Sequence, residues 1–193
     1  MRCPWAGTSP DYVAYHDTEW GRPVVDDVAI YEKLCLEGFQ SGLAWITILR
    51  KRENFREAFN AFDPHAVAGF GAADVARLLG DAGIVRHRGK IEATITNARA
   101  VVALWDAGRS LASLVWSFEP DRTSRPAPGG LESLPASTAE SVALSKQLRH
   151  CGFVFVGPTT AYSAMQALGV VNDHLDTCHV RAACEEARQA QQR

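Results

Sequence analysis

The most constraining feature of this sequence is an apolar stretch, residues 34–50, that contains a single carboxylate. Leucine and isoleucine recur so closely in it that a helix here would have no wide polar face, and such a helix is normally buried. Glu37 lies inside the stretch, and a buried carboxylate is costly unless a partner or a ligand compensates for its desolvation. Gly38 and Gly42 each cost a helix interior about 1 kcal/mol. We therefore expect a close approach to the backbone, or a bend, at this point.

Two interpretations of Glu37 stay open on this stretch alone. In the first, a flat ligand with polar edges lies against the segment, with Glu37 at its edge and an aromatic ring such as Trp45 on its face. In the second, the carboxylate only caps or pairs near a helix start. The helix is predicted to begin at Asp26 or Asp27 and to end in the basic run of residues 50–52.

The composition is that of a globular protein with a substantial core, because 47% of the 193 residues are hydrophobic. The formal net charge is -2, so a nucleic-acid surface can only be a local basic patch. No apolar run reaches the roughly 18 residues of a membrane span, and the N-terminus lacks the apolar core of a signal peptide. We therefore expect a cytoplasmic protein. Five cysteines without a dense framework argue against disulfides in that reducing compartment.

Residues 3–23 are aromatic and irregular, and hydrophobic spacing predicts a series of helices after them. The apolar run at residues 153–156 has no partner strand, so it is interpreted as part of a tight hairpin between two helices. We expect a single domain over residues 1–193, with a long loop at about 119–135 and the hairpin at about 151–161. The local signals for this assignment are the apolar residues Phe55, Ala58, Phe59 and Phe62, the helix start Asp63-Pro64, helices near residues 72–79, 91–105 and 110–118, the capping box Ser137-Thr138-Ala139-Glu140, and the turn Gly157-Pro158.

The densest basic cluster precedes the predicted helix at residues 91–105, and it consists of Arg86, His87, Arg88 and Lys90. Such a cluster is either an anion site that also uses helix N–H groups or a solvated turn. Four basic groups in so short a segment repel one another without an anion, which favours the first interpretation. The helix that follows Gly157 likewise has free N–H groups in its first turn for a phosphate.

Two pairs of potential metal ligands lie at opposite ends of the chain. His174 and Cys178 are four residues apart, on one face if the segment is helical, and Cys3 and His16 lie in the irregular N-terminal segment. Together they form a Cys2His2 set that suits a tetrahedral zinc ion and leaves no open position for catalysis. The alternative is four unrelated residues, with His179 as an equally close histidine.

Several separated motifs, in order, resemble the Tag family of 3-methyladenine DNA glycosylases, within the helix-hairpin-helix glycosylase superfamily. The resemblance covers nearly the whole chain. The motifs are Tyr15-His16-Asp17-x-Glu19-Trp20-Gly21, Leu36-Glu37-Gly38-x-Gln40-x-Gly42-Leu43-x-Trp45-Ile46, Asp81-Ala82-Gly83-Ile84 with Arg86-His87-Arg88-Gly89-Lys90-Ile91, Val115-Trp116-Ser117-Phe118, and Val171-Asn172-Asp173-His174.

This resemblance implies an all-α fold in two lobes with a structural zinc clamp, whose ligands map onto the Cys2His2 set named above. It also implies that Gly157, Thr159 and Thr160 of the hairpin, together with Arg86, Arg88 and Lys90, contact DNA. The chain departs from the superfamily pattern in two places. Phe155 replaces the first glycine of the Gly-x-Gly hairpin, and Asn172 stands where many members carry a catalytic aspartate. Asn172 is then either a hydrogen-bonding core residue or a sugar contact.

The implied reaction is hydrolysis of the N-glycosidic bond of 3-methyladenine in double-stranded DNA. The methylated purine is already cationic and leaves as a neutral base, so selective binding can supply much of the rate. The resemblance assigns Glu37 to reading the base, Tyr15 to its edge and Trp45 to its face, with Trp5 and Trp20 as further walls. The base must first be flipped from the stack.

We expect a monomeric enzyme without lyase activity, because Thr159 lies near the superfamily's lysine position. Two alternatives remain. A non-catalytic damage-binding module would bind alkylated DNA without releasing a base. A zinc hydrolase acting on a small molecule would need an open position on the metal.

Overall fold

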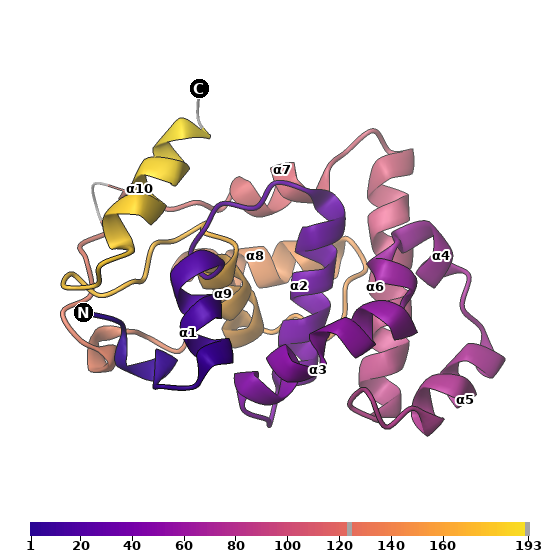
Figure 1. The fold of residues 1–193 in the computed structure, drawn as a ribbon. Helices are drawn as coiled ribbons and strands as arrows, with labels where there is room; N and C mark the ends of the chain where they lie inside the picture. The colour runs from indigo at the N-terminus through magenta and orange to yellow at the C-terminus, as the bar shows by residue number, and fades with distance from the viewer. Residues whose placement is uncertain (123–124, 192–193) are drawn as a thin grey trace.

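The computed structural model describes residues 1–122 and 125–191, and this part of the chain is helical without a strand, which confirms the all-α prediction (Figure 1). No described helix is both long enough and apolar enough to cross a membrane. The elements in chain order are η1 (Pro4–Ala6), α1 (Pro10–Thr18), α2 (Asp27–Gln40), α3 (Trp45–Ala58), η2 (Asn60–Phe62), α4 (Pro64–Ala68), α5 (Ala72–Gly80), α6 (Arg88–Asp106), α7 (Leu111–Trp116), η4 (Leu131–Ser133), α8 (Ala139–His150), α9 (Pro158–Ala167) and α10 (Arg181–Ala190).

Helix α2 lies at the centre of the fold and packs against both α9 and α6 (Figure 1). It begins as predicted, because the Asp26 carboxylate accepts a hydrogen bond from Ala29 N at 2.8 Å. Its apolar residues Tyr31, Leu34 and Phe39 are fully buried. Burying each such side chain contributes roughly 1.5–3 kcal/mol, so the packing of α2 carries Glu37 into the protein interior.

The prediction of one helix over residues 34–50 is wrong. The stretch holds the end of α2 and the start of α3, because Gly42 between them has a φ of 83°, which a right-handed helix cannot contain. The basic run at residues 50–52 therefore lies inside α3 and not at a helix end. The break also places Glu37 and Trp45 on different helices, so that they can face one another.

The predicted aromatic core after α3 is confirmed. Phe55, Phe59 and Phe62 are each fully buried, and the Phe59 and Phe62 rings stack at 5.5 Å between centroids. The predicted start of α4 is also confirmed, because the Asp63 side chain accepts a hydrogen bond from His65 N at 2.9 Å. These residues fill the side of α2 that faces α6.

The segment at residues 174–178 is not helical, so the condition for His174 and Cys178 to share a helix face is not met. One local prediction in the C-terminal half needs correction. The capping box of α8 pairs Thr138 with Ser141, one residue beyond the predicted Glu140, because the helix begins one residue later than the motif implied. A short non-helical segment joins α8 to α9, and α9 begins after Gly157 with Pro158 in its first turn; this segment is called the hairpin below, as in the prediction.

Asp27 joins α2 to the start of α7. Its carboxylate accepts hydrogen bonds from Trp105 Nε1 at 2.6 Å, Ser110 Oγ at 2.9 Å, Leu111 N at 3.0 Å and Ala112 N at 2.7 Å. Burial acts to raise the pKa of Asp27, but these hydrogen bonds outweigh it and the pKa lies below its ordinary value. The carboxylate therefore serves as the N-terminal cap of a neighbouring helix.

We expect Asp27→Ala to lower the free energy of unfolding by about 2 kcal/mol at neutral pH, because partly buried donors lose their acceptor. A depressed pKa gives stability that is present above the unfolded-state pKa and is lost as the pH falls through the folded-state pKa. Urea denaturation at neutral pH and at about pH 3 measures this, since the difference from wild type should shrink in acid. Asp26→Ala, which removes one cap, is the control. A deficit that does not change with pH would contradict the prediction.

Candidate active site and metal cluster

A cavity of about 190 Å³ brings together all the residues predicted to bind the base. Glu37 from α2 and Trp45 from α3 line it with Trp5 and Tyr15 from the N-terminal helices and Trp20 from the segment after α1. The structure thus collects these side chains into one aromatic pocket with a carboxylate in its wall. Their roles stay predictions.

Sequence reasoning missed other residues that line the same pocket. Tyr12 lies three residues before Tyr15 on α1, and Gln40 lies three residues after Glu37 on α2. This spacing places each pair on one helix face, so it was a usable signal. Leu134 comes from the long loop, and no local pattern marked it. The missed lining residues are Tyr12, Gln40, Leu134, Ser163 and Gln166.

Glu37 is buried and lies near the C-terminal end of α2, so the interpretation as a cap near a helix start is wrong. Its Oε1 lies 3.1 Å from Nζ of Lys33, one helical turn earlier. Burial raises the pKa of the Glu37 carboxyl, and Lys33 acts in the opposite direction. Burial likewise lowers the pKa of Lys33, against the effect of Glu37. The carboxylate in the pocket wall is therefore one half of a buried ion pair, and nothing in the sequence pattern had singled out Lys33.

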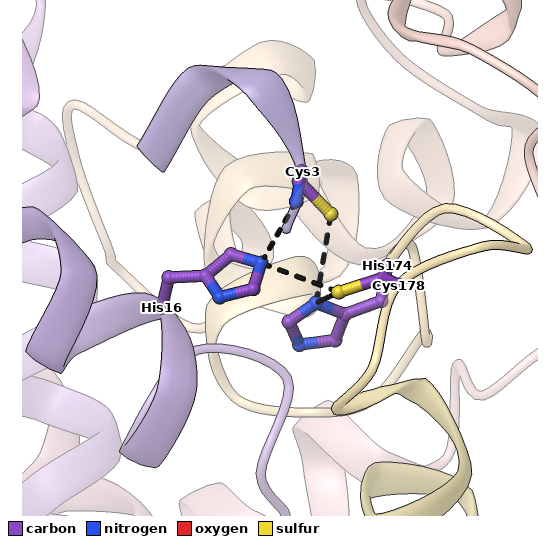
Figure 2. A group of neighbouring side chains, drawn as sticks. All are labelled: Cys3, His16, His174 and Cys178. Carbon is purple, nitrogen blue, oxygen red and sulfur yellow. Dashed lines mark hydrogen bonds between the residues drawn. The ribbon is translucent and has the colours of Figure 1, made fainter. Parts of the chain in front are cut away.

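The four predicted metal ligands meet in one cluster (Figure 2). All four residues are buried, and their ligand atoms lie within 4.8 Å of one another. The sulfur of Cys178 lies 3.5 Å from both His16 Nε2 and His174 Nδ1, and the sulfur of Cys3 lies 3.7 Å from His174 Nδ1. A tetrahedral zinc ion sets sulfur and nitrogen ligands roughly 3.5 Å apart, given its ordinary bond lengths. The cluster could hold a metal of this kind.

The partners of the two histidine rings fix which nitrogen faces the cluster, where His16 Nε2 accepts a hydrogen bond from Cys3 N at 3.3 Å. His16 Nδ1 lies 2.7 Å from Asp17 Oδ1, so it donates there and leaves the Nε2 lone pair toward the cluster. His174 Nε2 lies 3.0 Å from Trp20 O, a donation that leaves its Nδ1 lone pair toward the cluster. Burial lowers the pKa of His174 to about 4, which keeps the ring neutral. Both rings are therefore oriented as metal ligands.

The cluster and the aromatic pocket share a wall. The ring centroid of Trp5 lies 5.2 Å from that of His16, and the ring centroid of Trp20 lies 4.7 Å from that of His174. Trp5 and Trp20 also contact one another edge to face, at 5.0 Å between centroids. The cluster thus positions two of the tryptophans that line the pocket.

The hairpin and the N-terminus of α6 lie side by side. Phe155 has a φ of 57°, in the left-handed region where the superfamily pattern has glycine, and its ring lies 6.4 Å from that of His87. Asn97 of α6 holds the hairpin backbone, because its side chain accepts from Val154 N at 2.8 Å and donates to Val154 O at 3.2 Å. Phe155 therefore adopts the left-handed backbone conformation of this turn although it is not a glycine.

The predicted DNA-contacting residues differ in exposure. Arg86, Arg88 and Thr159 are exposed at this surface, and Gly157 and Thr160 are half-buried beside it.

Lys90 does not share this surface. It is buried, and its ammonium donates to Phe39 O at 2.9 Å and Ser41 O at 2.6 Å. The Lys90 ammonium thus caps the carbonyl groups at the C-terminus of α2. It is not available to a phosphate, so the structure does not support the DNA contact predicted for Lys90.

Asn172 faces away from the aromatic pocket. Its side-chain nitrogen donates to Arg181 O at 3.1 Å and to Glu185 Oε2 at 3.3 Å, both on α10. The structure therefore places Asn172 as a hydrogen-bonding core residue, the first of the two alternatives for this position.

Known proteins with established names are similar to this chain over almost its whole length. It is 46% identical to the DNA-3-methyladenine glycosylase of Haemophilus influenzae over 177 residues. The aligned region covers 92% of this chain and 96% of that protein. It is 50% identical over 177 residues to DNA-3-methyladenine glycosylase 1 of Escherichia coli, with 92% and 95% covered.

Solved structures agree with this similarity. A crystal structure of 3-methyladenine DNA glycosylase I matches with a TM-score of 0.88 and 49% identity, over 93% of this chain and 98% of that one. A tyrosine-to-phenylalanine variant of 3-methyladenine DNA glycosylase I, in complex with 3-methyladenine, matches with a TM-score of 0.86 and 33% identity, over 93% and 97%. The family model for methyladenine glycosylases matches residues 5–182. The chain therefore belongs to the methyladenine glycosylase family.

Proposed function

We propose that this protein excises 3-methyladenine from alkylated double-stranded DNA by hydrolysing its N-glycosidic bond, as the first step of base excision repair. The observation that carries the proposal is the buried Glu37 carboxylate in the wall of an aromatic pocket, in a chain of the methyladenine glycosylase family. The names of the relatives support the same reaction.

In this proposal, the damaged nucleotide is flipped out of the helix and its base enters the pocket. Trp45 stacks on the face of the base, Tyr15 lies beside it, and Trp5 and Trp20 close the walls. Glu37 accepts hydrogen bonds from the adenine edge and favours its positive charge in a site shielded from water. These contacts orient the nucleotide for attack without a strong acid.

The bond that breaks is the one between N9 of the base and C1′ of the sugar. Its electron pair leaves with the cationic base, which departs neutral, and a water oxygen bonds to C1′ and gives up a proton to solvent. A lyase step would need an amine at the sugar. Thr159 stands near the superfamily's lysine position, and Lys33 lies beyond Trp45 in a second cavity, so we propose a monofunctional enzyme.

The DNA backbone is proposed to lie on the surface formed by the hairpin and the start of α6. The α8–hairpin–α9 unit is then a helix-hairpin-helix. The first-turn N–H groups of Thr159 and Thr160 and the side chains of Arg86 and Arg88 bind phosphates. The burial of Lys90 leaves it outside this contact.

We also propose that Cys3, His16, His174 and Cys178 hold one structural zinc ion, which clamps the two ends of a single two-lobed domain, monomeric in solution. With four protein ligands the ion supplies no catalytic position and acts only by fixing the fold. Both histidine tautomers, and the burial of all four residues, support the assignment.

The test is release of free 3-methyladenine by the purified protein from methylated duplex DNA, measured by chromatography of the released bases. We expect release from methylated DNA, none from unmethylated DNA, and abasic sites whose strands stay intact until alkali is added. Binding to methylated DNA without release would instead support the damage-binding module. Strand cleavage without alkali would overturn the monofunctional assignment.

A further inference from the structure

Lys33 is a buried cation that contacts three members of the proposed base pocket. Its Nζ lies 3.1 Å from Glu37 Oε1, donates to Tyr15 Oη at 2.6 Å, and lies 3.7 Å from the centroid of the Trp45 ring. Only 13% of its side chain is exposed. A lysine four residues before a glutamate normally forms a weak solvated pair on a helix surface. Here the pair is enclosed by aromatic rings, so its charge acts at short range in a medium of low polarity.

Tyr15 and Trp45 separate two cavities. The base pocket is lined by Glu37 and not by Lys33, whereas a second cavity of about 140 Å³ is lined by Lys33 and not by Glu37. Tyr15 and Trp45 line both. Trp45 therefore borders both the pocket proposed for the base and the cavity that Lys33 lines, with the ammonium 3.7 Å from its ring centroid.

The other charged groups around Lys33 are engaged with one another. Arg52 of α3 pairs with Glu19 of the segment after α1, with 2.5 Å between Arg52 Nη1 and Glu19 Oε2. Arg56 of α3 pairs with Glu32 of α2 at 2.8 Å. All four residues line the second cavity. Glu37 is thus the carboxylate that pairs with Lys33, and the ammonium offsets the charge of the carboxylate in the wall of the base pocket.

We propose that Lys33 is a specificity-determining residue: its ammonium occupies the interactions with Glu37 and Trp45 that a cationic base would make, and so weakens the preference of the pocket for cationic over neutral purines. This inference rests on the proposed function, because it requires that a purine enters this pocket. The chemical class that Lys33 affects is the purine whose ring carries a positive charge.

The physical reason is competition for one carboxylate and one aromatic ring. A cation over a ring is attracted by the negative face of the ring, and a second cation on the opposite face is repelled by the first. The carboxylate likewise attracts an incoming cation less when an ammonium lies beside it. A neutral purine stacks on Trp45 and hydrogen-bonds to Glu37 with little sensitivity to that ammonium. Removing the Lys33 charge should therefore act on one class of base only.

The ammonium also favours the ionised form of Glu37. The charged groups nearby are Glu19, Glu32, Arg52 and Arg56, already paired as described, and the Tyr15 hydroxyl, whose pKa burial raises. Burial raises the pKa of Glu37 and Lys33 opposes this rise. Without Lys33 the pKa of Glu37 should therefore be higher, and the acid limb of base release should move to higher pH.

The experiment compares two free bases in the wild type and in Lys33→Met, by quenching of tryptophan fluorescence at about pH 8, above the carboxyl range. The probes are neutral 3-methyladenine and the permanently cationic 3,9-dimethyladeninium ion. We expect Lys33→Met to raise the ratio of cation affinity to neutral-base affinity about tenfold, and Lys33→Arg, which keeps the charge, to stay near the wild-type ratio. Damage to the pocket as a whole would weaken the binding of both bases equally, so the ratio of the two affinities would not change. Lys33→Gln replaces Lys33→Met if the latter does not fold.

A ratio that stays the same in the uncharged variant overturns the inference, as does an acid limb of base release that does not move. If the wild type binds both bases and releases 3-methyladenine from DNA, that result leaves the proposed function standing. A folded wild type that binds neither base overturns the pocket assignment and this inference with it.

Discussion

The Glu37→Gln variant is expected to release 3-methyladenine from methylated duplex DNA about 100-fold more slowly than the wild type at neutral pH. The substitution keeps the size of the side chain and removes a negative charge from a dry site, where that charge interacts strongly with a cationic base. It also leaves the ammonium of Lys33, 3.1 Å away, without its counter-ion. Single-turnover release of the base, with enzyme in excess, measures the effect on chemistry apart from product release.

The pH dependence of base release distinguishes the effect of the Glu37 charge from the effect of the size of its side chain. Protonation of the wild-type carboxyl produces a neutral side chain like that of glutamine, so wild-type release should fall as the pH drops through the raised pKa of Glu37. The variant has no such group and should show a flat profile over the same range. Glu53→Gln on the exposed side of α3 is the matched control and should change the rate less than twofold. Equal rates in Glu37→Gln and wild type would remove Glu37 from the proposed mechanism.

Local signals were sufficient for most helix starts, because a cap is decided by residues within one turn. Asp26 and Asp63-Pro64 mark the starts of α2 and α4 as predicted. The break between α2 and α3 was missed, since apolar residues continue on both sides of it and the helix ends in the backbone angles of Ser41 and Gly42. Hydrophobic periodicity predicts burial well, but it does not show where a buried helix stops.

The Cys/His cluster was predictable from residue chemistry. His174 and Cys178 were expected on one face if their segment was helical; it is not helical, and a turn brings the two side chains together instead. Cys3 and His174 are separated by 171 positions in the sequence, so no local pattern could show that they meet. The residue types suggested the Cys2His2 set, the resemblance to a family strengthened it, and the structure brings the four residues together.

The lysines show the limit of sequence reasoning most clearly. Lys33 and Lys90 both look like surface residues, one in a helical Lys-Glu pair and the other in a basic cluster. Both are turned inward, Lys33 to Glu37 and Lys90 to the carbonyl groups at the end of α2. A long side chain can point either way from one backbone position, so its direction depends on packing that the sequence does not state.

Loss of the proposed zinc ion is expected to have the largest effect on stability. We expect one zinc ion per chain in the wild type by mass spectrometry, and its loss in Cys178→Ser. A ligand that binds only the folded state stabilises it by about 4 kcal/mol when its free concentration is a thousand times the Kd. In a protein of this size, that corresponds to a fall in Tm of about 10 °C or more. Chelation of the wild type should lower the Tm by a similar amount, and added zinc should restore it.

Cys184→Ser is the matched control, because Cys184 is fully buried beside the cluster, with its sulfur 4.0 Å from Trp20 O, yet it is not one of the four ligands. We expect it to keep zinc and to lose much less stability. Because Trp5 and Trp20 contact the ligand histidines, Cys178→Ser should also weaken binding of 3-methyladenine, measured below its reduced Tm, whereas Cys184→Ser should not. A wild-type protein that contains no zinc, and whose Tm chelation leaves unchanged, would show that the cluster is packed core and that the pocket wall stands without a metal.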